Sequence, residues 1–427
     1  MVVVVLFAAC APPPAPGDDD GGPPGSDATS GTPAVTFYRD LQPLLAAGCA
    51  RCHGPDGLPP GDFLDPTVAI PWAAVMVDRI AAGEMPPPSA DPTCHPYQDA
   101  DRYAADPALA DLLDQWIALG QPLGEPTEPP EIPQPTTLSR RDAVLYTAGP
   151  YTPAFVDGNE YRCFLIDDGV DADAYLAGIE ALIDNPAISH HAILFVDPDG
   201  GSERRIEDAA SASWRCRDVQ PEPEWLMAHA WAPSGGAIEF PDGAGLKVTR
   251  GSQLVLQMHY FAGEVDPPPD QPGYALKLAP RVDRELFYVP IGPTDFVIPP
   301  GDPAYSARLD LPMWALTFGF LAYDVYGVLP HMHVLGTGYR FYATAPNGDQ
   351  KCISRGTDYD FAMQPTYWFD QPIAVETDDV LTIECTWDNT AGNPRQLSNP
   401  PVAVGWGENT QQEMCYALLY VGARLDL

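Results

Sequence analysis

Basic residues are scarce in this sequence. Lysine and arginine together number 22 in a chain of 427 residues, against 59 aspartates and glutamates, which gives a formal net charge of −37 at pH 7. Such an acidic chain repels the phosphates of nucleic acids, so nucleic acid is excluded as a partner. Long apolar runs are also lacking, because nothing after the first ten residues is long enough to span a bilayer. Histidine is rare too, with 8 residues, so the places where histidines gather are informative.

Proline, glycine and apolar residues, by contrast, are plentiful. The 51 prolines and 37 glycines separate many short segments, and 45% of the residues are hydrophobic. A chain of this length can form two or three domains, each with its own core. Short segments between turn signals favour strands over long helices.

The first ten residues, MVVVVLFAAC, form a short apolar run that ends at Cys10. This run resembles a bacterial lipoprotein signal, in which the cysteine becomes the lipidated N-terminus; an ordinary secretory peptide is the alternative. A signal peptide normally begins with a positively charged region, but no Lys or Arg precedes this run. We therefore expect the true start of the protein upstream. Residues 11–33 are rich in Pro, Gly and Asp, which makes residues 1–33 a signal and a solvated tether. We therefore expect export to the periplasm or cell surface, with lipid on Cys10 as the membrane anchor.

Residues 48–54, GCARCHG, contain the C-x-x-C-H pattern at Cys49, Cys52 and His53. In c-type cytochromes the two thiols bind the haem vinyl groups and the histidine binds the iron, so we expect one covalent haem c. A redox C-x-x-C pair and half of a zinc site are the alternatives. Met85, in the segment AAGEMPPP, is the expected distal ligand of the iron.

Met76 and His95 are weaker candidates for this distal ligand, because WAAVMVDRIAA has the pattern of a helix with Met76 in its core. A further helix is expected at residues 107–119, where one face carries Leu109, Leu112, Leu113, Trp116 and Ile117. Residues 34–122 as a whole resemble a class I cytochrome c, which is a small all-α domain. The proline-rich residues 123–138 then form a semi-rigid linker.

Short alternating segments follow the linker. NEYRCFLID, HAILFV and GSQLVLQMHYF are typical of strands between turns and predict all-β sandwiches. Histidines lie in or beside these segments at five positions, His190, His191, His259, His331 and His333. The sixth histidine of this region, His229, lies elsewhere.

His331 and His333 are separated by one residue, so in a strand both imidazoles lie on the same face. Met414, in NTQQEMCYALLY, is a possible third ligand. Two imidazoles and a thioether suit copper, because the soft sulfur favours Cu(I) and imidazole binds both oxidation states. Each feature alone has a simpler explanation: histidines on an exposed strand face, and a methionine in the core.

His190 and His191 are neighbours, so in a regular strand their side chains point to opposite faces. They can bind a common ion only where the backbone bends, as it can at a strand end. With His259 they would form a second, all-imidazole site that also holds copper in both oxidation states. Zinc is the alternative for three histidines.

The order of these motifs resembles one known family. A His-His pair, Q-x-H-Y, H-x-H-x-x-G and E-M-C follow one another as in the copper type II ascorbate-dependent monooxygenases, the family of peptidylglycine α-hydroxylating monooxygenase and dopamine β-monooxygenase. WAPSGG at residues 231–236 and ECTWDNT at 384–390 are further similar segments. The resemblance covers residues 139–427. It implies two jelly-roll-like domains, 139–283 and 284–427, whose coppers face each other across a solvent-filled cleft.

The same resemblance assigns a role to each ligand set. A copper that transfers electrons would be bound by His190, His191 and His259. The copper that activates oxygen, and so the catalytic group, would be bound by His331, His333 and Met414.

Two positions depart from the peptide-amidating members of that family. Those members have an arginine that grips the substrate carboxylate two residues before H-x-H, where this chain has Leu329. They have a tyrosine four residues after the methionine, where this chain has Leu418. A glycine-extended peptide is therefore disfavoured as substrate. We expect a more apolar pocket, with Trp368, Tyr367 or Tyr420 nearby.

The nine cysteines are consistent with an oxidising compartment. Apart from Cys10, Cys49 and Cys52, six remain, and these allow fifteen pairings. The resemblance implies a disulfide between Cys385 and Cys415. The sequence does not choose among the pairings, although we also favour Cys163 with Cys216.

Together these expectations describe an exported protein with a small all-α cytochrome c domain followed by two all-β sandwich domains. It would use two copper ions and one haem c to hydroxylate a C–H bond of an unknown small-molecule or peptide substrate with O2. The haem would supply or relay electrons from an external donor, either an ascorbate-like reductant or a redox protein. The alternatives are a non-catalytic copper and haem electron-transfer or copper-binding protein, and a structural surface-binding module.

Overall fold

A computed structural model describes residues 34–424, except for residues 56, 59, 156–158, 168, 217–221, 223, 234, 262–266, 318–321, 362 and 408–410. Cys10, with the expected signal and tether, lies outside the described residues. The chain forms two compact units, one of residues 1–87 with 103–134 and one of residues 88–102 with 135–427. Among the described helices, none is long and apolar enough to cross a membrane.

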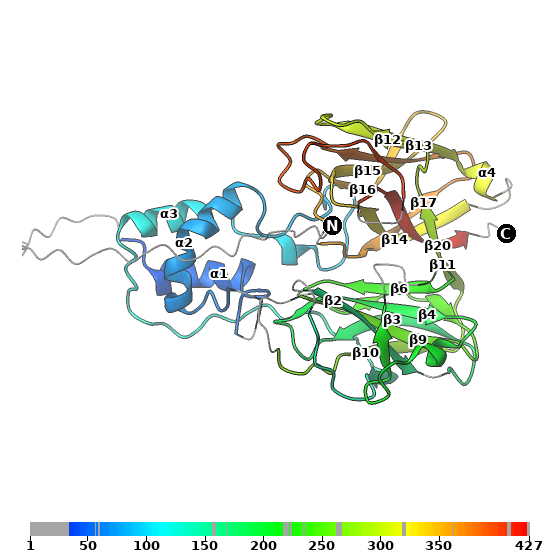
Figure 1. Cartoon of the computed structure of the whole chain (residues 1–427), viewed down its shortest axis with the longest axis horizontal. Coiled ribbons are helices and arrows are strands. Elements are labelled where there is room, and N and C mark those ends of the chain that lie inside the picture. Colours follow the sequence, from blue (N-terminus) through cyan, green and yellow to red (C-terminus); the bar gives the residue numbers. More distant parts are fainter. Residues whose placement is uncertain are drawn as a thin grey trace, which may run out of the picture. The chain divides into compact units, whose positions relative to one another are not determined.

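The smaller unit is built from short helices (Figure 1). They are α1 (Gln42–Gly48), α2 (Pro66–Ala81) and α3 (Leu109–Ala118), with a π-helical turn at Phe37–Leu41 before α1. α2 begins where the Asp65 side chain accepts a hydrogen bond from the backbone N–H of Thr67 at 2.8 Å, an N-cap that satisfies an otherwise free amide.

The core of this unit contains the apolar face that the sequence predicts for residues 107–119. Leu109, Leu113 and Trp116 of α3 are completely buried, and Leu112 and Ile117 pack against them in part. On α2, the Met76 side chain is buried in the same core, as expected for a core methionine. Apolar periodicity at helical spacing therefore predicts this part of the structure correctly.

The larger unit consists of β-sheets, as the alternating segments predict. A five-stranded sheet has the order β5 (Ser213–Arg215), β2 (Asn159–Asp167), β9 (Gln253–Phe261), β4 (Ser189–Asp197) and β6 (Leu226–Trp231). A four-stranded sheet has the order β13 (Tyr305–Pro312), β18 (Val380–Trp387), β15 (Gly336–Thr344) and β16 (Gln350–Gly356). A two-stranded pair joins β12 (Val297–Ile298) to β19 (Val404–Gly405), and the short helix α4 (Met313–Thr317) follows β13.

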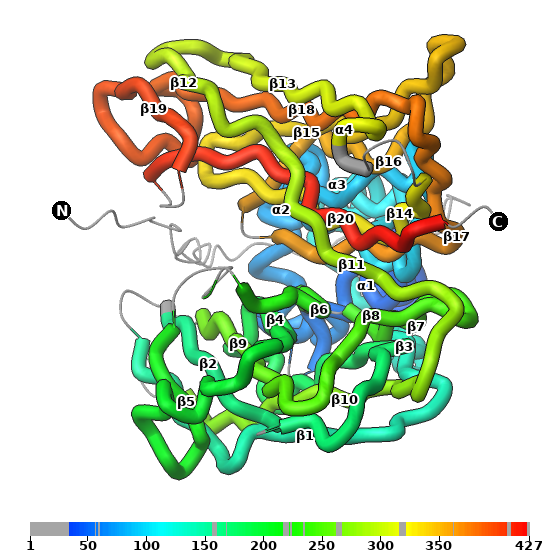
Figure 2. The backbone as a smooth tube through the Cα atoms, turned by 90° about the vertical axis from the view of Figure 1, so that its right-hand side faces the viewer, coloured from blue at the N-terminus to red at the C-terminus, as the bar shows by residue number. Residues whose placement is uncertain are grey.

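A nine-stranded sheet joins the two halves of this unit. Its order is β1 (Ala143–Tyr146), β10 (Gly273–Ala279), β3 (Ala174–Leu182), β8 (Ala244–Val248), β11 (Arg284–Ile291), β20 (Cys415–Arg424), β14 (Ala322–Met332) and β17 (Tyr367–Val375), with β7 (Ile238–Glu239) paired to β3. β11 pairs in parallel with β8 and antiparallel with β20, so it connects strands from before and after residue 284. Figure 2 shows β11, β20, β14 and β17 following one another across this sheet. The halves are therefore sandwiches that share a sheet.

Residues 88–102 belong to the larger unit although they lie between α2 and α3 in the sequence. We call this segment the strap. A disulfide joins Cys94 to Cys352 of β16, and an isolated β-bridge joins Tyr97 to Phe369 of β17. The sequence predicts one continuous helical domain over residues 34–122, and its local patterns contain no sign that this segment packs on β-strands.

The other two disulfides are the pairs that the sequence favours. Cys163 bonds to Cys216, and Cys385 of β18 bonds to Cys415 of β20. Three disulfides are typical of a protein that folds in an oxidising compartment, outside the cytosol.

Candidate metal centres

A β-bulge brings the adjacent residues His190 and His191 to the same side of a strand. In the ladder between β4 and β9, Ser189 lies opposite Tyr260 and His191 lies opposite His259, so the register shifts by one residue at His190. A bulge of this kind inserts an extra residue and turns its side chain away from strict alternation. This is the backbone bend that a shared ion would require.

Three imidazoles consequently meet at one end of the five-stranded sheet. One nitrogen from each of His190, His191 and His259 lies within 4.8 Å of the other two. The Nδ1 atom of His190 and the Nε2 atom of His191 are fully buried and have no hydrogen-bond partner among the described residues. The Tyr161 ring stacks on His259 with centroids 4.1 Å apart and planes inclined by 6°. Buried nitrogens that converge without partners are the donor set expected of a metal site.

Burial keeps these imidazoles neutral. Burial and, to a smaller extent, the neighbouring His190 imidazole lower the pKa of His191 to about 3. The pKa of His190 and that of His259 are also lowered by burial. Since only a neutral imidazole has a lone pair for a metal ion, the site has unprotonated ligands at neutral pH.

His331 and His333 lie together as their spacing predicts. His331 is the penultimate residue of β14 and lies opposite Tyr416 of β20, and His333 follows directly after the strand. Both residues are buried, and their ring centroids are 5.1 Å apart. Burial lowers the pKa of His331 to about 3.

Hydrogen bonds at Nδ1 orient both rings of this H-x-H pair. The Nδ1 atom of His331 lies 2.6 Å from Oε1 of Gln364, and that of His333 lies 3.0 Å from the backbone oxygen of Gln412. Because each partner is an acceptor, each Nδ1 carries the proton, and Nε2 is left with the lone pair. Both histidines can therefore bind a metal through Nε2.

Met414 lies next to the H-x-H pair by the register of β14 and β20. The ladder ends where Met332 is paired with Cys415, and His333 and Met414 are the next residues on the two sides. The Met414 side chain is half-buried. Residues that are 81 positions apart in the sequence are thus at the same end of one ladder, as a common ligand set requires.

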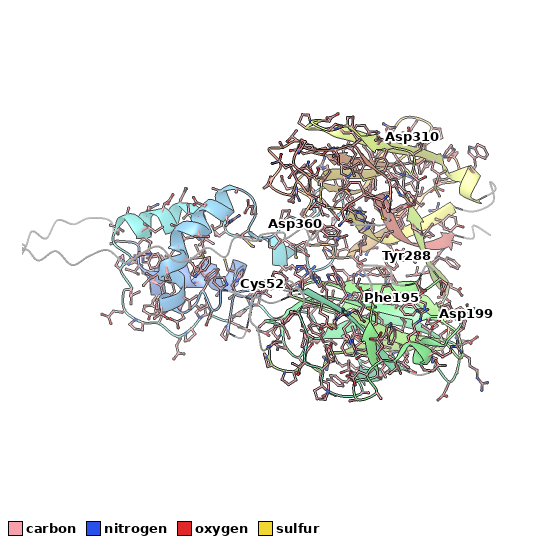
Figure 3. All side chains as sticks on the ribbon, in the orientation of Figure 1. Cys52, Phe195, Asp199, Tyr288, Asp310 and Asp360 are labelled. Atoms are coloured by element: carbon pink, nitrogen blue, oxygen red, sulfur yellow. A yellow bond between two sulfur atoms is a disulfide. The ribbon has the colours of Figure 1, made fainter. Side chains whose placement is uncertain are left out.

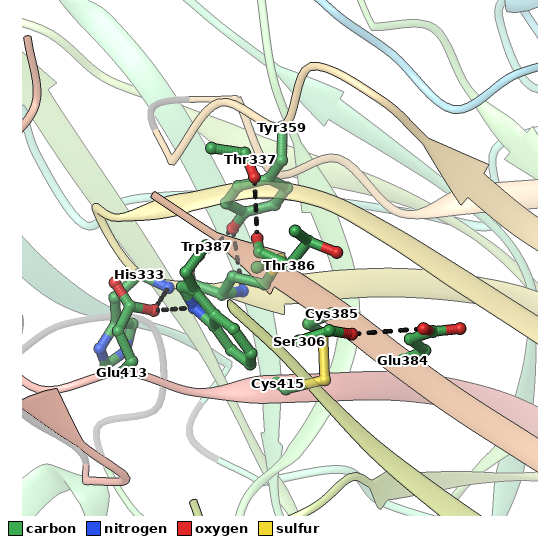
Figure 4. Close-up of a disulfide and its surroundings, with 11 residues drawn as sticks. Ser306, His333, Thr337, Tyr359, Glu384, Cys385, Thr386, Trp387, Glu413 and Cys415 are labelled. Atoms are coloured by element: carbon green, nitrogen blue, oxygen red, sulfur yellow. Dashed lines mark hydrogen bonds between the residues drawn. A yellow bond between two sulfur atoms is a disulfide. The ribbon is translucent and has the colours of Figure 1, made fainter. Parts of the chain in front are cut away.

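Glu413 is a site residue that the sequence analysis misses. Its buried carboxylate accepts hydrogen bonds from the backbone N–H of His333 at 2.9 Å and from Nε1 of Trp387 at 2.8 Å (Figure 4). It also accepts one from the backbone N–H of Leu335 at 2.7 Å. Burial raises the pKa of Glu413 to about 7. Glu413 directly precedes Met414, so its carboxylate holds the segment with the histidines at a fixed distance from the segment with the methionine. The sequence signal that could have identified Glu413 is its position in the E-M-C motif.

The C-x-x-C-H residues lie in a turn at the end of α1. The backbone N–H of His53 donates to the oxygen of Cys49 at 2.8 Å, and neither Cys49 nor Cys52 belongs to any of the three disulfides. Burial raises the pKa of the Cys49 thiol to about 12. The His53 ring is half-buried, 4.9 Å from the ring of Phe63.

The candidates for a distal iron ligand have different surroundings. Met85 is 43% exposed, which leaves its thioether accessible. Met76 is a core residue. His95 belongs to the strap, where its Nε2 atom lies 2.9 Å from the backbone oxygen of Gln371. These surroundings favour Met85 among the three.

The residues that the sequence associates with a substrate pocket are in the core. Leu329 and Leu418 are buried in an apolar cluster with Ile193, Met227 and Val255 of the other half. A second apolar cluster contains Trp368 and Tyr420, and Tyr367 is also buried. Leucines at positions 329 and 418 thus extend the packing between the halves. His229 is buried on β6, with Nδ1 3.4 Å from the Tyr274 hydroxyl, outside both histidine groups.

Comparisons with known proteins agree with the copper interpretation of the C-terminal half. Residues 297–426 match the family model described as copper type II ascorbate-dependent monooxygenase, C-terminal domain. DBH-like monooxygenase protein 1 from Gallus gallus is 23% identical over 221 residues, which cover 46% of this chain and 33% of that protein. The human protein of the same name is 25% identical over 218 residues, with the same coverage. The chain thus spans about a third of the length of these relatives.

Similarity to solved structures is weak. A peptide-N(4)-(N-acetyl-β-D-glucosaminyl)asparagine amidase has 11% identity and a TM-score of 0.31, with 66% of this chain and 96% of that chain covered. PNGase F from Flavobacterium meningosepticum has 11% identity and a TM-score of 0.30, with 66% and 95% covered. The matched residues 297–426 include His331, His333 and Met414, and this match and the two distant relatives support a relationship of the chain to the copper type II monooxygenase family.

Proposed function

We propose that the larger unit is a copper-dependent monooxygenase that converts R–H, O2, two electrons and two protons into R–OH and water. The observation that carries the proposal is the pair of histidine groups, one with three converging imidazoles and one with both rings oriented through Nδ1, in a chain that matches this family in its C-terminal half. Copper bound there would supply one-electron redox chemistry and oxygen activation.

The two ligand sets suit different tasks. His331 and His333 would hold one copper through Nε2, and the Met414 thioether would favour Cu(I), the state that reacts with oxygen. His190, His191 and His259 would hold the other copper in an all-nitrogen set that accepts both oxidation states. Zinc would fit the three histidines as well, but not the thioether, which is a poor zinc ligand.

The smaller unit is proposed to carry a covalent haem c that passes electrons to the copper centres. These residues fit a haem. Cys49 and Cys52 belong to none of the three disulfides and lie in the same turn as His53, and Met85 is accessible as a distal ligand. Haem would supply a one-electron carrier on the same chain. Export with a lipid on Cys10, an external electron donor and an unidentified small-molecule or peptide substrate complete the proposal.

Oxygen consumption tests the reaction directly. Copper-loaded protein with a reductant should consume O2, either coupled to a substrate or with release of peroxide, and Met414→His should bind copper but lose most of this activity. Copper-dependent oxygen consumption that is unchanged in Met414→His would contradict the assigned site.

A non-catalytic electron-transfer protein with the same metals is the second candidate. Burial of Leu329 and Leu418 in the core favours it, because the positions that bind substrate in the amidating members are filled by packing here. Electron transfer between protein and donor without any oxygen consumption would support this candidate.

A further inference from the structure

The connection between β16 and β17 contacts both residues of the H-x-H pair. It comprises residues 357–366, of which residue 362 lies outside the described part. Its sequence contains no metal-binding motif. Three of its side chains, those of Tyr359, Phe361 and Gln364, nevertheless lie against the end of β14 and the residue that follows it.

Tyr359 fixes this connection to the strand. Its buried hydroxyl accepts a hydrogen bond from the backbone N–H of Met332 at 3.0 Å and donates one to the backbone oxygen of Met332 at 2.8 Å. Met332 is the residue between the two histidines. Arg395 donates a further hydrogen bond, from Nη1 to the backbone oxygen of Tyr359 at 2.6 Å. The connection therefore has a fixed position relative to the H-x-H pair.

Gln364 has both ends of its amide in use. Its Oε1 atom lies 2.6 Å from Nδ1 of His331, and its Nε2 atom donates to the backbone oxygen of Phe361 at 2.7 Å. Since the amide nitrogen faces a carbonyl oxygen, the amide oxygen must face His331, where it accepts from Nδ1–H. The Phe361 ring in turn packs edge-on against His333, with centroids 5.8 Å apart.

Asp360 follows Tyr359 in the same connection. Figure 3 labels Asp360 in the C-terminal half.

We propose that Gln364 is a positioning residue of the H-x-H centre, which sets the tautomer and ring orientation of His331 so that Nε2 points to the metal. This inference rests on the proposed function, because it takes copper as the ion bound there. An acceptor at Nδ1–H also makes an imidazole a stronger donor through its other nitrogen, and loss of such a partner typically weakens metal binding by about 10- to 100-fold. Gln364 would therefore affect both the affinity and the electron density of the copper.

The test compares three substitutions in the full-length, copper-loaded protein. Gln364→Leu removes the acceptor at similar volume, and Gln364→Glu supplies a stronger acceptor. Gln371→Leu, at an exposed glutamine of β17, is the matched control. Cu(I) affinity is measured by competition with a chromophoric chelator. The infrared stretch of carbon monoxide bound to the reduced protein reports the electron density at the copper.

The expected results differ in direction. Gln364→Leu should weaken Cu(I) binding at one of the two sites by about 10- to 100-fold and raise the carbon monoxide frequency, because a weaker imidazole donor reduces back-donation. Gln364→Glu should keep the affinity and lower the frequency, while Gln371→Leu should match the wild type. A residue with a merely structural role would not shift the frequency in opposite directions.

Several outcomes would overturn the inference. Wild-type affinity and frequency in Gln364→Leu would do so while leaving the proposed function intact. A wild-type protein without copper at this centre would overturn both. Should Gln364→Leu fail to fold, Gln364→Asn keeps the amide but is one carbon shorter, and an unchanged carbon monoxide frequency in that variant would count equally against the inference.

Discussion

The backbone N–H of His333 donates a 2.9 Å hydrogen bond to the carboxylate of Glu413, 80 residues further along the chain. The same carboxylate accepts two more hydrogen bonds, from Leu335 and Trp387. A single side chain therefore joins the segment with the two histidines to the segment with the methionine.

Glu413→Gln is expected to destabilise the C-terminal half. The glutamine NH2 group cannot accept the hydrogen bonds that one carboxylate oxygen accepts, so buried donors lose partners at a cost of about 2–3 kcal/mol. The free energy of unfolding, from urea titration, measures this loss, and copper content at the H-x-H centre should fall with it. Glu384→Gln, a half-buried glutamate on β18, is the control and should change stability by less than about 0.5 kcal/mol. Equal stability of the two variants would contradict the role assigned to Glu413.

His229 should make the protein less stable in acid. Burial lowers the pKa of His229 to about 3, whereas an unfolded histidine titrates near 6.5. Between these pH values the unfolded chain binds a proton that the folded chain does not, so the contribution of His229 is complete above pH 6.5 and is lost as the pH falls. The loss approaches about 1.4 kcal/mol per pH unit.

The comparison of wild type with His229→Gln isolates this effect. Unfolding free energies at pH 8, 6 and 5 should fall more steeply for the wild type than for the variant, and both should hold the same amount of copper. Loss of copper in His229→Gln would show that this histidine serves a metal site after all.

The strap should depend on its disulfide. Cys94 and Cys352 are 258 residues apart in the sequence, so their bond closes a long loop. The double variant Cys94→Ser/Cys352→Ser should lose about 2–4 kcal/mol of stability and become sensitive to proteases within residues 88–102. Asp91→Asn removes only the partly exposed ion pair with Arg355 and should cost less than about 1 kcal/mol. A strap that resists proteases equally in the double variant would contradict this role for the disulfide.

Met76 and Met85 of the smaller unit should behave differently. Protein made with a cytochrome c maturation system should carry covalent haem, visible by haem staining of a denaturing gel. Met85→Ala should then convert a low-spin spectrum to a high-spin one at little cost in stability. Met76→Ala should leave the spectrum unchanged but cost about 2–5 kcal/mol, because Met76 is a core residue. A blank gel would contradict the haem proposal, and an unchanged Met85→Ala spectrum would move the distal ligand elsewhere.

Local patterns in the sequence predict the local structure. Leu109, Leu113 and Trp116 repeat at helical spacing and form a buried face, while His331 and His333 repeat at strand spacing and lie together. Even the bend at His190 follows from the sequence, because two adjacent imidazoles can share an ion only if the alternation is broken.

The missed features depend on contacts between distant segments. Gln364 lies 33 residues from His331 in a connection without periodicity, and nothing local marks its amide as a partner for an imidazole. Cys94 could have paired with any of the five other cysteines. Leu329 and Leu418 suggest an apolar pocket from sequence alone, but whether apolar side chains line a pocket or fill a core depends on what packs against them.

Copper stoichiometry in three proteins tests the central claim most directly. Metal-balanced purification and elemental analysis should give two copper ions per chain for the wild type, and one each for His190→Ala and His331→Ala. Reduced His190→Ala should still bind carbon monoxide, because its remaining copper is the one with the Met414 thioether, and reduced His331→Ala should not. Zinc at both sites of the wild type, or carbon monoxide binding that is lost in His190→Ala and kept in His331→Ala, would contradict the account.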